Sequence, residues 1–396
     1  MKFVIVLSTL LVLTVAIEHN KHKNPKFTAQ MVRFNKQNQI IEPTSTSSSE
    51  TNEQSPNILK TKLYNQEKCK LIPPPTSDEL LQFHQWTLQF NRTYQTAEEH
   101  ICRTVYVIQS IREIHEHNKL YDEGKVKFTR RLNELSDLTT EERNYRLIMM
   151  NKNARNNNFE DYPDLPDARE SVDYRKEGLV TKVGLQIRCN SCYAWSSAAV
   201  LEGQLRKCGI SRKSVSVQSE VDCTTASSWH CKSGFPYSVF RWQMKGGILP
   251  ASKYPYEDKD GICAYSRNDV LAYVDIPYDY DFYNVDDGHE YMKKLVSHYG
   301  PIASGICSSD TFEDYSSGVY EVDDCCTDAN HAIAIVGYGT DPKDGDYWLV
   351  KNSWGPTWGD NGFGKIARGK NMCEFETEVY FAQVRDVNGK VCRVFS

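Results

Sequence analysis

The sequence lacks three features: a long hydrophobic run after its first sixteen residues, an excess of positive charge, and a second compact ligand pair of the kind that completes a zinc site. A formal net charge of −5 gives no basic balance of the kind that nucleic-acid binding requires. Residues 1–16, MKFVIVLSTLLVLTVA, are apolar but shorter than the roughly 20 residues that a membrane span needs. We therefore expect a signal peptide cleaved after Ala16, no membrane anchor and no nucleic-acid partner.

Cysteine is abundant, with 13 residues in the chain. A chain that enters the secretory pathway meets an oxidising compartment, so disulfides are expected. Because the number is odd, at least one thiol stays outside an intrachain pair. We expect a monomer in the lysosome or outside the cell, with no metal and no other cofactor.

Composition divides the chain into segments. Residues 17–76 contain the low-complexity run IEPTSTSSSETNEQS and the proline-rich IPPPTS, which predict a disordered extension. Residues 77–150 begin with apolar side chains at helical spacing. The polar run at 151–164 predicts an exposed linker that is open to proteolysis. Residues 165–396, rich in Gly, Tyr, Trp and Cys, predict a compact body. One N-glycosylation sequon begins at Asn91, where a helix break would expose it.

The stretch QIRCNSCYAW, residues 186–195, holds Cys189 and Cys192 in a Cys-x-x-Cys spacing. Zinc would need a second compact ligand pair, and a redox pair would need a βαβ context; two ordinary disulfide cysteines are the structural alternative. Apolar spacing after Cys192 predicts a helix with Ser191 as its cap and Gly209 at its end. The helix dipole would favour a thiolate at Cys192, whereas Cys189 lies in the loop.

A nucleophilic cysteine needs a base and a group that orients the base. HAIAIVG (331–337) and DYWLVKN (346–352) are strand-like, and YGTDPKDG between them is rich in turn residues. If the strands pair with 337 opposite 346, His331 lies opposite Asn352 on one face. A histidine at a strand end is more often an ordinary side chain than a catalytic one. The register favours the catalytic interpretation.

Several ordered pieces of the body resemble the papain-like cysteine proteases, the cathepsins. They are SVDYRKEGLVTKV, QIRCNSCYAWS, SEVDCTTASSWHCKSGFP, YPYEDKDGIC, NHAIAIVGYG and KNSWGPTWGDNGFGKI. The resemblance implies an α+β fold, with a helical domain and a β-barrel-like domain, and an N-terminal helical propeptide. It implies a secreted or lysosomal zymogen of a cysteine endopeptidase that hydrolyses peptide bonds through a thioester on Cys192.

The resemblance also implies individual roles. Cys192 matches the nucleophile, His331 the base and Asn352 the amide that orients it. Gln186 matches the side-chain donor of the oxyanion hole, and Trp354 matches the indole that shields the His–Asn contact from water. Trp354 would otherwise be read as a core aromatic.

Disulfides follow from the same family pattern. The implied pairs are Cys189–Cys231, Cys223–Cys263 and Cys373 with Cys325 or Cys326, for which we take Cys325. The remaining cysteines considered could form two further bridges, Cys307 with Cys325 or Cys326, and Cys208 with Cys392.

The prefix resembles the cathepsin propeptide. The matching positions are Glu99, Arg103, Ile114, Asn118, Asn133 and Asp137. Alone, a charged pair at this spacing is usually a solvated helix face. Upstream of the matching body, it implies an inhibitor that lies through the cleft until it is cleaved.

Substrate contacts are implied at Gly234, Phe235, Pro236 and Glu378. If CEFETEVYF is a strand, Glu374, Glu376 and Glu378 share one face. The family register places Glu378 at the base of the pocket for the second residue upstream of the cut, with Phe235 and Pro236 on its walls. A carboxylate there would admit Arg or Lys; the alternative is a solvated acidic edge.

Three positions near the cleft depart from the family pattern. Asn190 and Ser233 replace glycines, and Tyr193 replaces a tryptophan. Asn190 and Ser233 support an alternative function, a catalytically degraded member that binds peptides. Intact Cys192, His331, Asn352 and Gln186 argue against it. A third possibility, a prefix that also inhibits proteases separately, is compatible with the enzyme.

Overall fold

The structure is a computed structural model that describes residues 69, 73–139, 141–143, 147, 162–224, 230–283 and 285–392. The expected signal peptide, most of the expected extension and most of the linker lie outside this part. The described residues belong to one compact unit. None of the helices described is both long and apolar enough to cross a bilayer.

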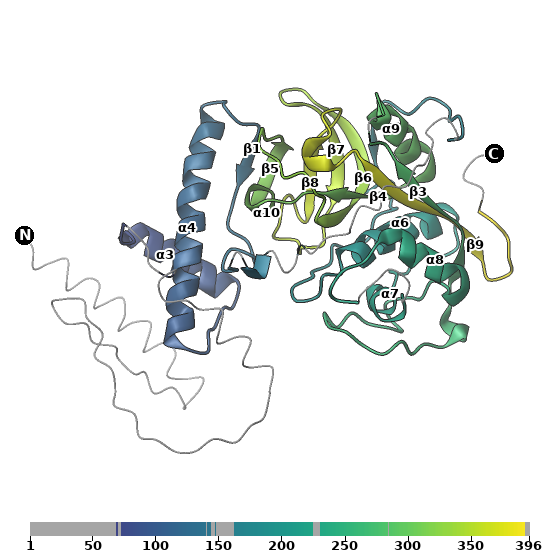
Figure 1. Cartoon of the computed structure of the whole chain (residues 1–396), viewed down its shortest axis with the longest axis horizontal. Coiled ribbons are helices and arrows are strands. Elements are labelled where there is room, and N and C mark those ends of the chain that lie inside the picture. Colours follow the sequence, from purple (N-terminus) through teal and green to yellow (C-terminus); the bar gives the residue numbers. More distant parts are fainter. Residues whose placement is uncertain are drawn as a thin grey trace, which may run out of the picture. The chain divides into compact units, whose positions relative to one another are not determined.

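The prefix forms two helices that pack together, α3 (Ser77–Gln89) and α4 (Ala97–Asp122) (Figure 1). Helix α3 begins with a capping box, in which the Thr76 hydroxyl and the Glu79 carboxylate each accept from the other residue's backbone N–H. Phe83 and Trp86 of α3 are buried against Val107, Ile108 and Ile111 of α4.

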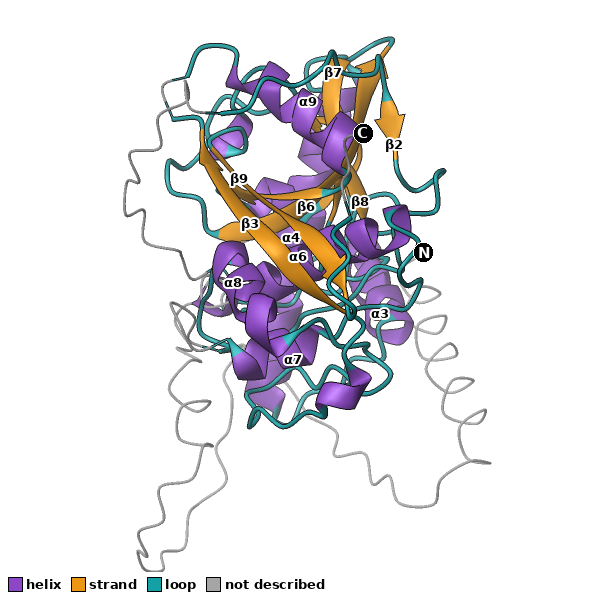
Figure 2. Cartoon of the chain, turned by 90° about the vertical axis from the view of Figure 1, so that its right-hand side faces the viewer, coloured by secondary structure: helices purple, strands orange, loops and turns teal. Residues whose placement is uncertain are grey.

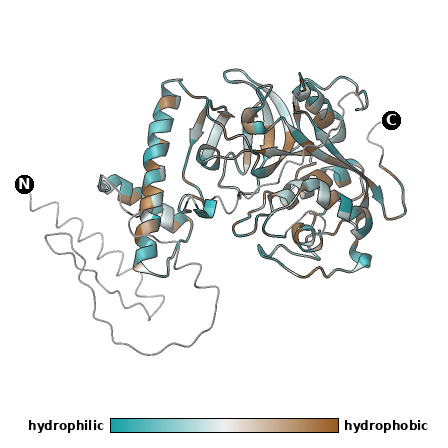
Figure 3. Cartoon of the chain, in the orientation of Figure 1, coloured by the Kyte–Doolittle hydropathy of each residue, from teal (hydrophilic) through white to brown (hydrophobic). Residues whose placement is uncertain are grey.

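Apolar and polar residues are mixed along α4 (Figure 3). The helix buries one stripe against α3, and charged side chains cover much of its exposed surface. Asn91 lies in the break between the two helices, is exposed, and has a φ of 48°.

Nine strands join in one sheet within the described residues. The strands are β1 (Phe128–Arg130), β2 (Val172–Asp173), β3 (Ala272–Asp281), β4 (Ile302–Ile306), β5 (Tyr315–Tyr320), β6 (His331–Asp341), β7 (Gly345–Lys351), β8 (Phe363–Ala367) and β9 (Glu378–Asp386). Their order is β1-β5-β8-β7-β6-β4-β9-β3, and β2 pairs with β6. Strand β1 belongs to the prefix and extends the sheet of the body, with Phe128 opposite Gly318 of β5.

Helices α6 (Cys192–Lys207) and α8 (Pro236–Gly246) pack against the long β3–β9 pair (Figure 2). The body also contains α7 (Val217–Cys223), α9 (Gly288–Tyr299), α10 (Asp310–Glu313), η2 (Arg267–Asp269) and η3 (Met372–Glu374). Helix α6 packs against β6, β4, β9, α7 and α8, which makes it the central helix of the body. Its expected apolar face, which includes Ala194, Ala198, Leu201 and Leu205, is buried. The α+β fold that the sequence predicts is therefore confirmed.

The expected register of the β6–β7 hairpin is wrong. Gly337 pairs with Leu349 rather than with residue 346, and the strands continue until Asp341 pairs with Gly345. Gly345 has a φ of 91°, a conformation that suits glycine, so the tight turn lies just before it. The run YGTD, which was expected to be part of the turn, instead extends β6.

His331 and Asn352 still meet, but not as paired residues of one hairpin. His331 pairs with Ile306 of β4, and Asn352 follows the last residue of β7. A bulge between Ile335 and Gly337 shifts the register along β6.

Six disulfides pair twelve of the thirteen cysteines, all of which lie in the described part of the chain. They are Cys69–Cys102, Cys189–Cys231, Cys208–Cys392, Cys223–Cys263, Cys307–Cys326 and Cys325–Cys373. Sequence analysis did not anticipate the first pair, which ties the prefix upstream of α3 to α4.

Candidate active site

Cys192 is the first residue of α6, is 8% exposed, and is the one cysteine outside the six disulfides. The expected capping by Ser191 is wrong, because its side chain makes no cap hydrogen bond. Its Oγ instead lies 2.7 Å from the Tyr256 hydroxyl and 3.3 Å from the carbonyl oxygen of Cys189. Gly209 does follow the helix end, with a φ of 65°.

A second chain segment runs beside the loop that precedes Cys192. The disulfide Cys189–Cys231 joins the two segments, and the Asn190 N–H donates to the Cys231 carbonyl over 2.9 Å. The Asn190 side chain donates to the Lys232 carbonyl over 3.1 Å. Asn190, which replaces a family glycine, is thus bound to the neighbouring segment.

The tyrosine that follows Cys192 is also accommodated. The Tyr193 hydroxyl donates to the His230 carbonyl over 3.0 Å. A Cβ at Gly234 would lie 2.6 Å from the Tyr193 ring, so this position requires glycine. Ser233 beside it is buried.

His331, the first residue of β6, is 3% exposed. Its Nε2 lies 2.9 Å from Asn352 Oδ1, which also accepts the Ser353 N–H over 2.8 Å. An oxygen that accepts a backbone N–H has to be the carbonyl end of the amide, so Nε2 carries the proton. That tautomer leaves Nδ1 as the basic nitrogen.

Trp354 covers the His331 ring. The two rings stack with centroids 4.4 Å apart and an interplanar angle of 24°, and Trp354 is 1% exposed. The indole therefore keeps water away from the contact between His331 and Asn352.

Gln186 is completely buried and is held from the same segment. Its N–H donates to the Ser353 carbonyl over 2.8 Å, and the Ser353 hydroxyl donates to its Oε1 over 2.7 Å. The amide nitrogen Nε2 is thereby turned toward the carbonyl of Cys189, 3.5 Å away. Sequence analysis missed Ser353; its place next to Asn352 was the one available signal.

The expectation that Glu374, Glu376 and Glu378 share a strand face is wrong. The chain turns through η3, and β9 begins only at Glu378. Glu376 is buried, and its Oε1 accepts from Trp348 Nε1 and the Gly369 N–H, each over 2.7 Å. Its role is therefore structural.

Glu378 stands at the start of β9, half-buried, and accepts from the Tyr380 hydroxyl over 2.6 Å. Helix α8 begins at Pro236, with Phe235 at its N-cap position, and packs against β9. The elements that carry these three residues are therefore neighbours.

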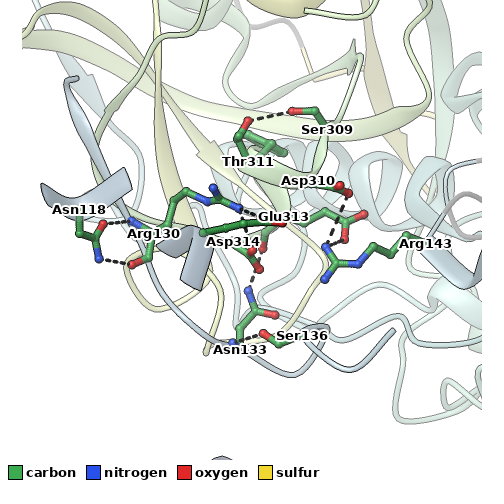
Figure 4. A network of polar contacts seen from close by, with 12 residues as sticks. Asn118, Arg130, Asn133, Ser136, Arg143, Ser309, Asp310, Thr311, Glu313 and Asp314 are labelled. Atoms are coloured by element: carbon green, nitrogen blue, oxygen red, sulfur yellow. Dashed lines mark hydrogen bonds and ion pairs between the residues drawn. The ribbon is translucent and has the colours of Figure 1, made fainter. Parts of the chain in front are cut away.

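The propeptide binds the body through buried charges (Figure 4). Arg130 donates to Asp314 over 3.1 Å, with side chains 7% and 2% exposed. Arg143 donates to Glu313 over 2.8 Å, with side chains 10% and 1% exposed. We call these contacts the propeptide ion pairs. Asn118 holds Arg130 with hydrogen bonds to both its backbone N–H and its carbonyl.

These charges perturb each other's protonation. Burial raises the pKa of Asp314, although Arg143 and Arg130 act in the opposite direction. Burial disfavours the charged form of Arg143, but Glu313 and Asp314 outweigh it and raise the pKa of this guanidinium.

The matched propeptide motif is also internally bonded. Arg103 is 7% exposed and donates to the Asp137 carbonyl over 2.7 Å and to Glu142. Its guanidinium lies 3.7 Å from Glu99. The pair Glu99–Arg103 is therefore part of a packed interface rather than a solvated helix face.

Family comparisons place this geometry in a class. The description "Papain family cysteine protease" matches residues 168–383, and "Cathepsin propeptide inhibitor domain (I29)" matches residues 83–143. A catalytic body with its own inhibitory segment defines a cysteine protease zymogen.

The chain belongs to the papain family. It is 35% identical to cathepsin L of Sarcophaga peregrina, over 73% of this chain and 88% of the relative. It is 36% identical to human cathepsin L2, over 76% and 92%. The solved structure of digestive procathepsin L 3 of the Tenebrio molitor larval midgut superposes with a TM-score of 0.69 at 29% identity, covering 78% of this chain and 99% of that one. The protein is thus a cysteine endopeptidase zymogen whose propeptide inhibits it intramolecularly.

Proposed function

We propose that Cys192 is the nucleophile of this endopeptidase and His331 its general base and acid. The support is the protonated Nε2 of His331, bonded to Asn352 over 2.9 Å, which leaves Nδ1 to exchange a proton with the thiol. A thiolate–imidazolium pair at a helix N-terminus lowers the thiol pKa far below about 8.5. Attack on the substrate carbonyl therefore begins from an ionised sulfur.

In this mechanism Sγ of Cys192 bonds to the carbonyl carbon, and the carbonyl oxygen becomes an oxyanion. The side-chain amide of Gln186 and the Cys192 N–H donate to it, and each such donor is worth about 3 kcal/mol. His331 then protonates the leaving amine, and a thioester remains. Water attacks the thioester with His331 as base, which releases the acid and the thiol.

Specificity is proposed to involve Glu378 at the base of the pocket for the second residue upstream of the cut. The support is the packing of α8 against β9 and the half-buried carboxylate at the start of β9. Phe235 and Pro236 would form apolar walls, and Gly234 would bind the substrate backbone. A substrate with Arg at that position should be preferred over one with an uncharged residue of similar size.

The mature body is proposed to begin near residue 165, with 77–150 as propeptide, 151–164 as processing linker, 17–76 as extension and 1–16 as signal peptide. The support is that the chain is held against the body from the end of the linker onward. Tyr162, near the end of the linker, stacks on Tyr280 with ring centroids 3.9 Å apart, and Leu165 just after the linker is buried. We further propose a monomer without a membrane anchor, delivered to lysosomes or exported, with a glycan at the exposed Asn91.

A peptidyl epoxide that traps the active thiol tests the assignment. Acid-activated protein should react once the propeptide is removed, and Cys192→Ala should not. Processed, folded protein that refuses the label would instead favour the alternative of a degraded, peptide-binding family member.

A further inference from the structure

We propose that Asp258 is a positioning residue for the oxyanion hole, because its carboxylate holds the loop that carries Gln186. The inference rests on the function proposed above for Gln186 and Cys192. Neither the motif analysis nor the family pattern singled out this aspartate.

Asp258 accepts hydrogen bonds from three consecutive backbone groups. Its Oδ1 accepts the N–H of Ile187 over 3.0 Å and that of Cys189 over 3.2 Å, and its Oδ2 accepts the N–H of Arg188 over 2.9 Å. The loop lies outside helices and strands, so its amides have no regular ladder to join. The carboxylate replaces that ladder and fixes the path of the chain between Gln186 and Cys189.

The same carboxylate is connected to the other donor of the hole. The Tyr256 hydroxyl donates to Asp258 Oδ1 over 2.9 Å and lies 2.7 Å from Ser191 Oγ. Ser191 immediately precedes Cys192, whose N–H is the second proposed oxyanion donor. Asp258 therefore stabilises both ends of the segment from Gln186 to Cys192.

A carboxylate suits this position better than an amide. Each of its two oxygens accepts, so one side chain serves three N–H donors and a hydroxyl. In Asp258→Asn only one oxygen can still accept. The amide NH₂ is itself a donor, and it would face either the Arg188 N–H or the N–H groups of Ile187 and Cys189, so those hydrogen bonds would be lost. Asp258 has a φ of 56°, a conformation open to Asn and Gly, so neither substitution strains the backbone.

The expected consequence is a loss of turnover rather than of substrate binding. Oxyanion donors act on the transition state, and a misplacement of about 1 Å can cost about 10²-fold. Because Ser353 still holds Gln186 from the other side, we expect about a tenfold lower kcat in Asp258→Asn, with KM within about twofold.

The experiment measures kcat and KM of mature enzyme in a double-mutant cycle of Asp258→Asn with Gln186→Ala. If Asp258 acts through Gln186, then Asp258→Asn should lower kcat by far less than tenfold in protein that already carries Gln186→Ala. The proposal would be overturned if the losses of kcat in the two single variants simply added in the double variant. It would also be overturned if Asp258→Asn changed only KM. The matched control is Glu257→Gln, a neighbouring carboxylate that is 53% exposed and pairs with Lys259. It should leave both constants unchanged.

Two further measurements separate this proposal from the proposed function and from misfolding. Alkylation of Cys192 by iodoacetamide needs no oxyanion hole, so Asp258→Asn should keep the wild-type rate. A matching fall in alkylation would mean general damage to the site and would overturn the positioning role. Asp258→Gly should repeat the loss of kcat, and wild-type kcat in that variant would equally overturn it. Wild-type protein that neither alkylates nor turns over would refute the proposed function itself.

Discussion

The pair Arg143–Glu313 gives a quantitative prediction about latency. In Arg143→Met the propeptide keeps an aliphatic side chain of similar length, but Glu313 stays buried without its cation, at 1% exposure. Removing one partner of a buried ion pair costs about 3–5 kcal/mol. Here the cost falls on the docked propeptide, because undocking lets water reach the carboxylate. At about 1.4 kcal/mol per factor of ten, docking should weaken by a factor of roughly 10² to 4 × 10³.

Epoxide labelling of Cys192 in the intact zymogen measures this effect. At neutral pH the label reacts only with molecules whose propeptide is undocked, so the labelling rate reports the undocked fraction. Arg143→Met should raise the rate by a factor of roughly 10² to 4 × 10³, up to the limit set by mature enzyme. Rates are taken at dilution, before any cleavage is visible on a gel.

The double variant Arg143→Met with Glu313→Met decides whether the pairing is the cause. Replacing both partners of a buried pair with apolar groups is often nearly neutral, so latency should return. The control, Arg169→Met, breaks an exposed pair with Glu177 and should change little. A double variant that labels as fast as the single one would refute the reasoning, because unpaired burial of Glu313 would not be the source of the loss.

Three further predictions concern the propeptide, each measured in the Cys192→Ala zymogen. Hydrogen bonds from Arg112 and from the Thr76 N–H lower the pKa of Glu79 to about 2. The ionised form of Glu79 therefore stabilises the fold above pH 4.5 by about 1 kcal/mol, and this contribution is lost as pH falls toward 2. In Glu79→Gln the melting temperature should lack this part of its pH dependence. Because the pKa of Asp314 is raised, its protonation stabilises the docked state on acidification, and this contribution is lost as pH rises through the raised pKa. Asp314→Asn leaves the buried Arg130 without its anion and should weaken docking at neutral pH, but gel filtration of the variant across pH should lack this pH-dependent contribution. A variant that keeps the wild-type pH dependence would contradict the assignment to Asp314. The Cys69–Cys102 bond spans 33 residues, so replacing both cysteines with serine should destabilise the propeptide by about 3–4 kcal/mol in urea titrations.

Local patterns in the sequence correctly predicted several features of the structure. The helix that begins at Cys192 and the contact between His331 and Asn352 were both expected from spacing. The hairpin argument reached the contact by a wrong register, because residues 342–344 alone, rather than the whole run YGTDPKDG, make the turn. Turn residues mark where a hairpin can bend, but the strand pairing decides how many of them remain extended.

Acidic side chains show why the rest could not be predicted. In the sequence, Glu376 is one of three alternating carboxylates. In the structure, a tight turn buries it, and it accepts a hydrogen bond from the Trp348 indole. Asp258 reads as a loop residue, and its three N–H partners lie about 70 residues away in the chain. No periodicity distinguishes a carboxylate that accepts backbone N–H groups from one that is solvated, because the difference lies in distant backbone geometry.

The propeptide ion pairs extend this argument to inhibition. Arg130 and Asp314 are 184 residues apart, and Arg143 and Glu313 are 170 apart. Motif residues Arg103 and Asn118 join α4 to the propeptide segment that follows it, whereas the arginines of the ion pairs hold the propeptide to the body. Asn133 of the motif adds one bond to the body, from its side chain to the Glu313 carbonyl. Because a buried carboxylate is costly without its cation, the acids of α10 and the residue after it select for a propeptide that brings arginines to the same points. Fit between propeptide and enzyme therefore depends on charges contributed by both sides, and the propeptide motif alone does not determine it.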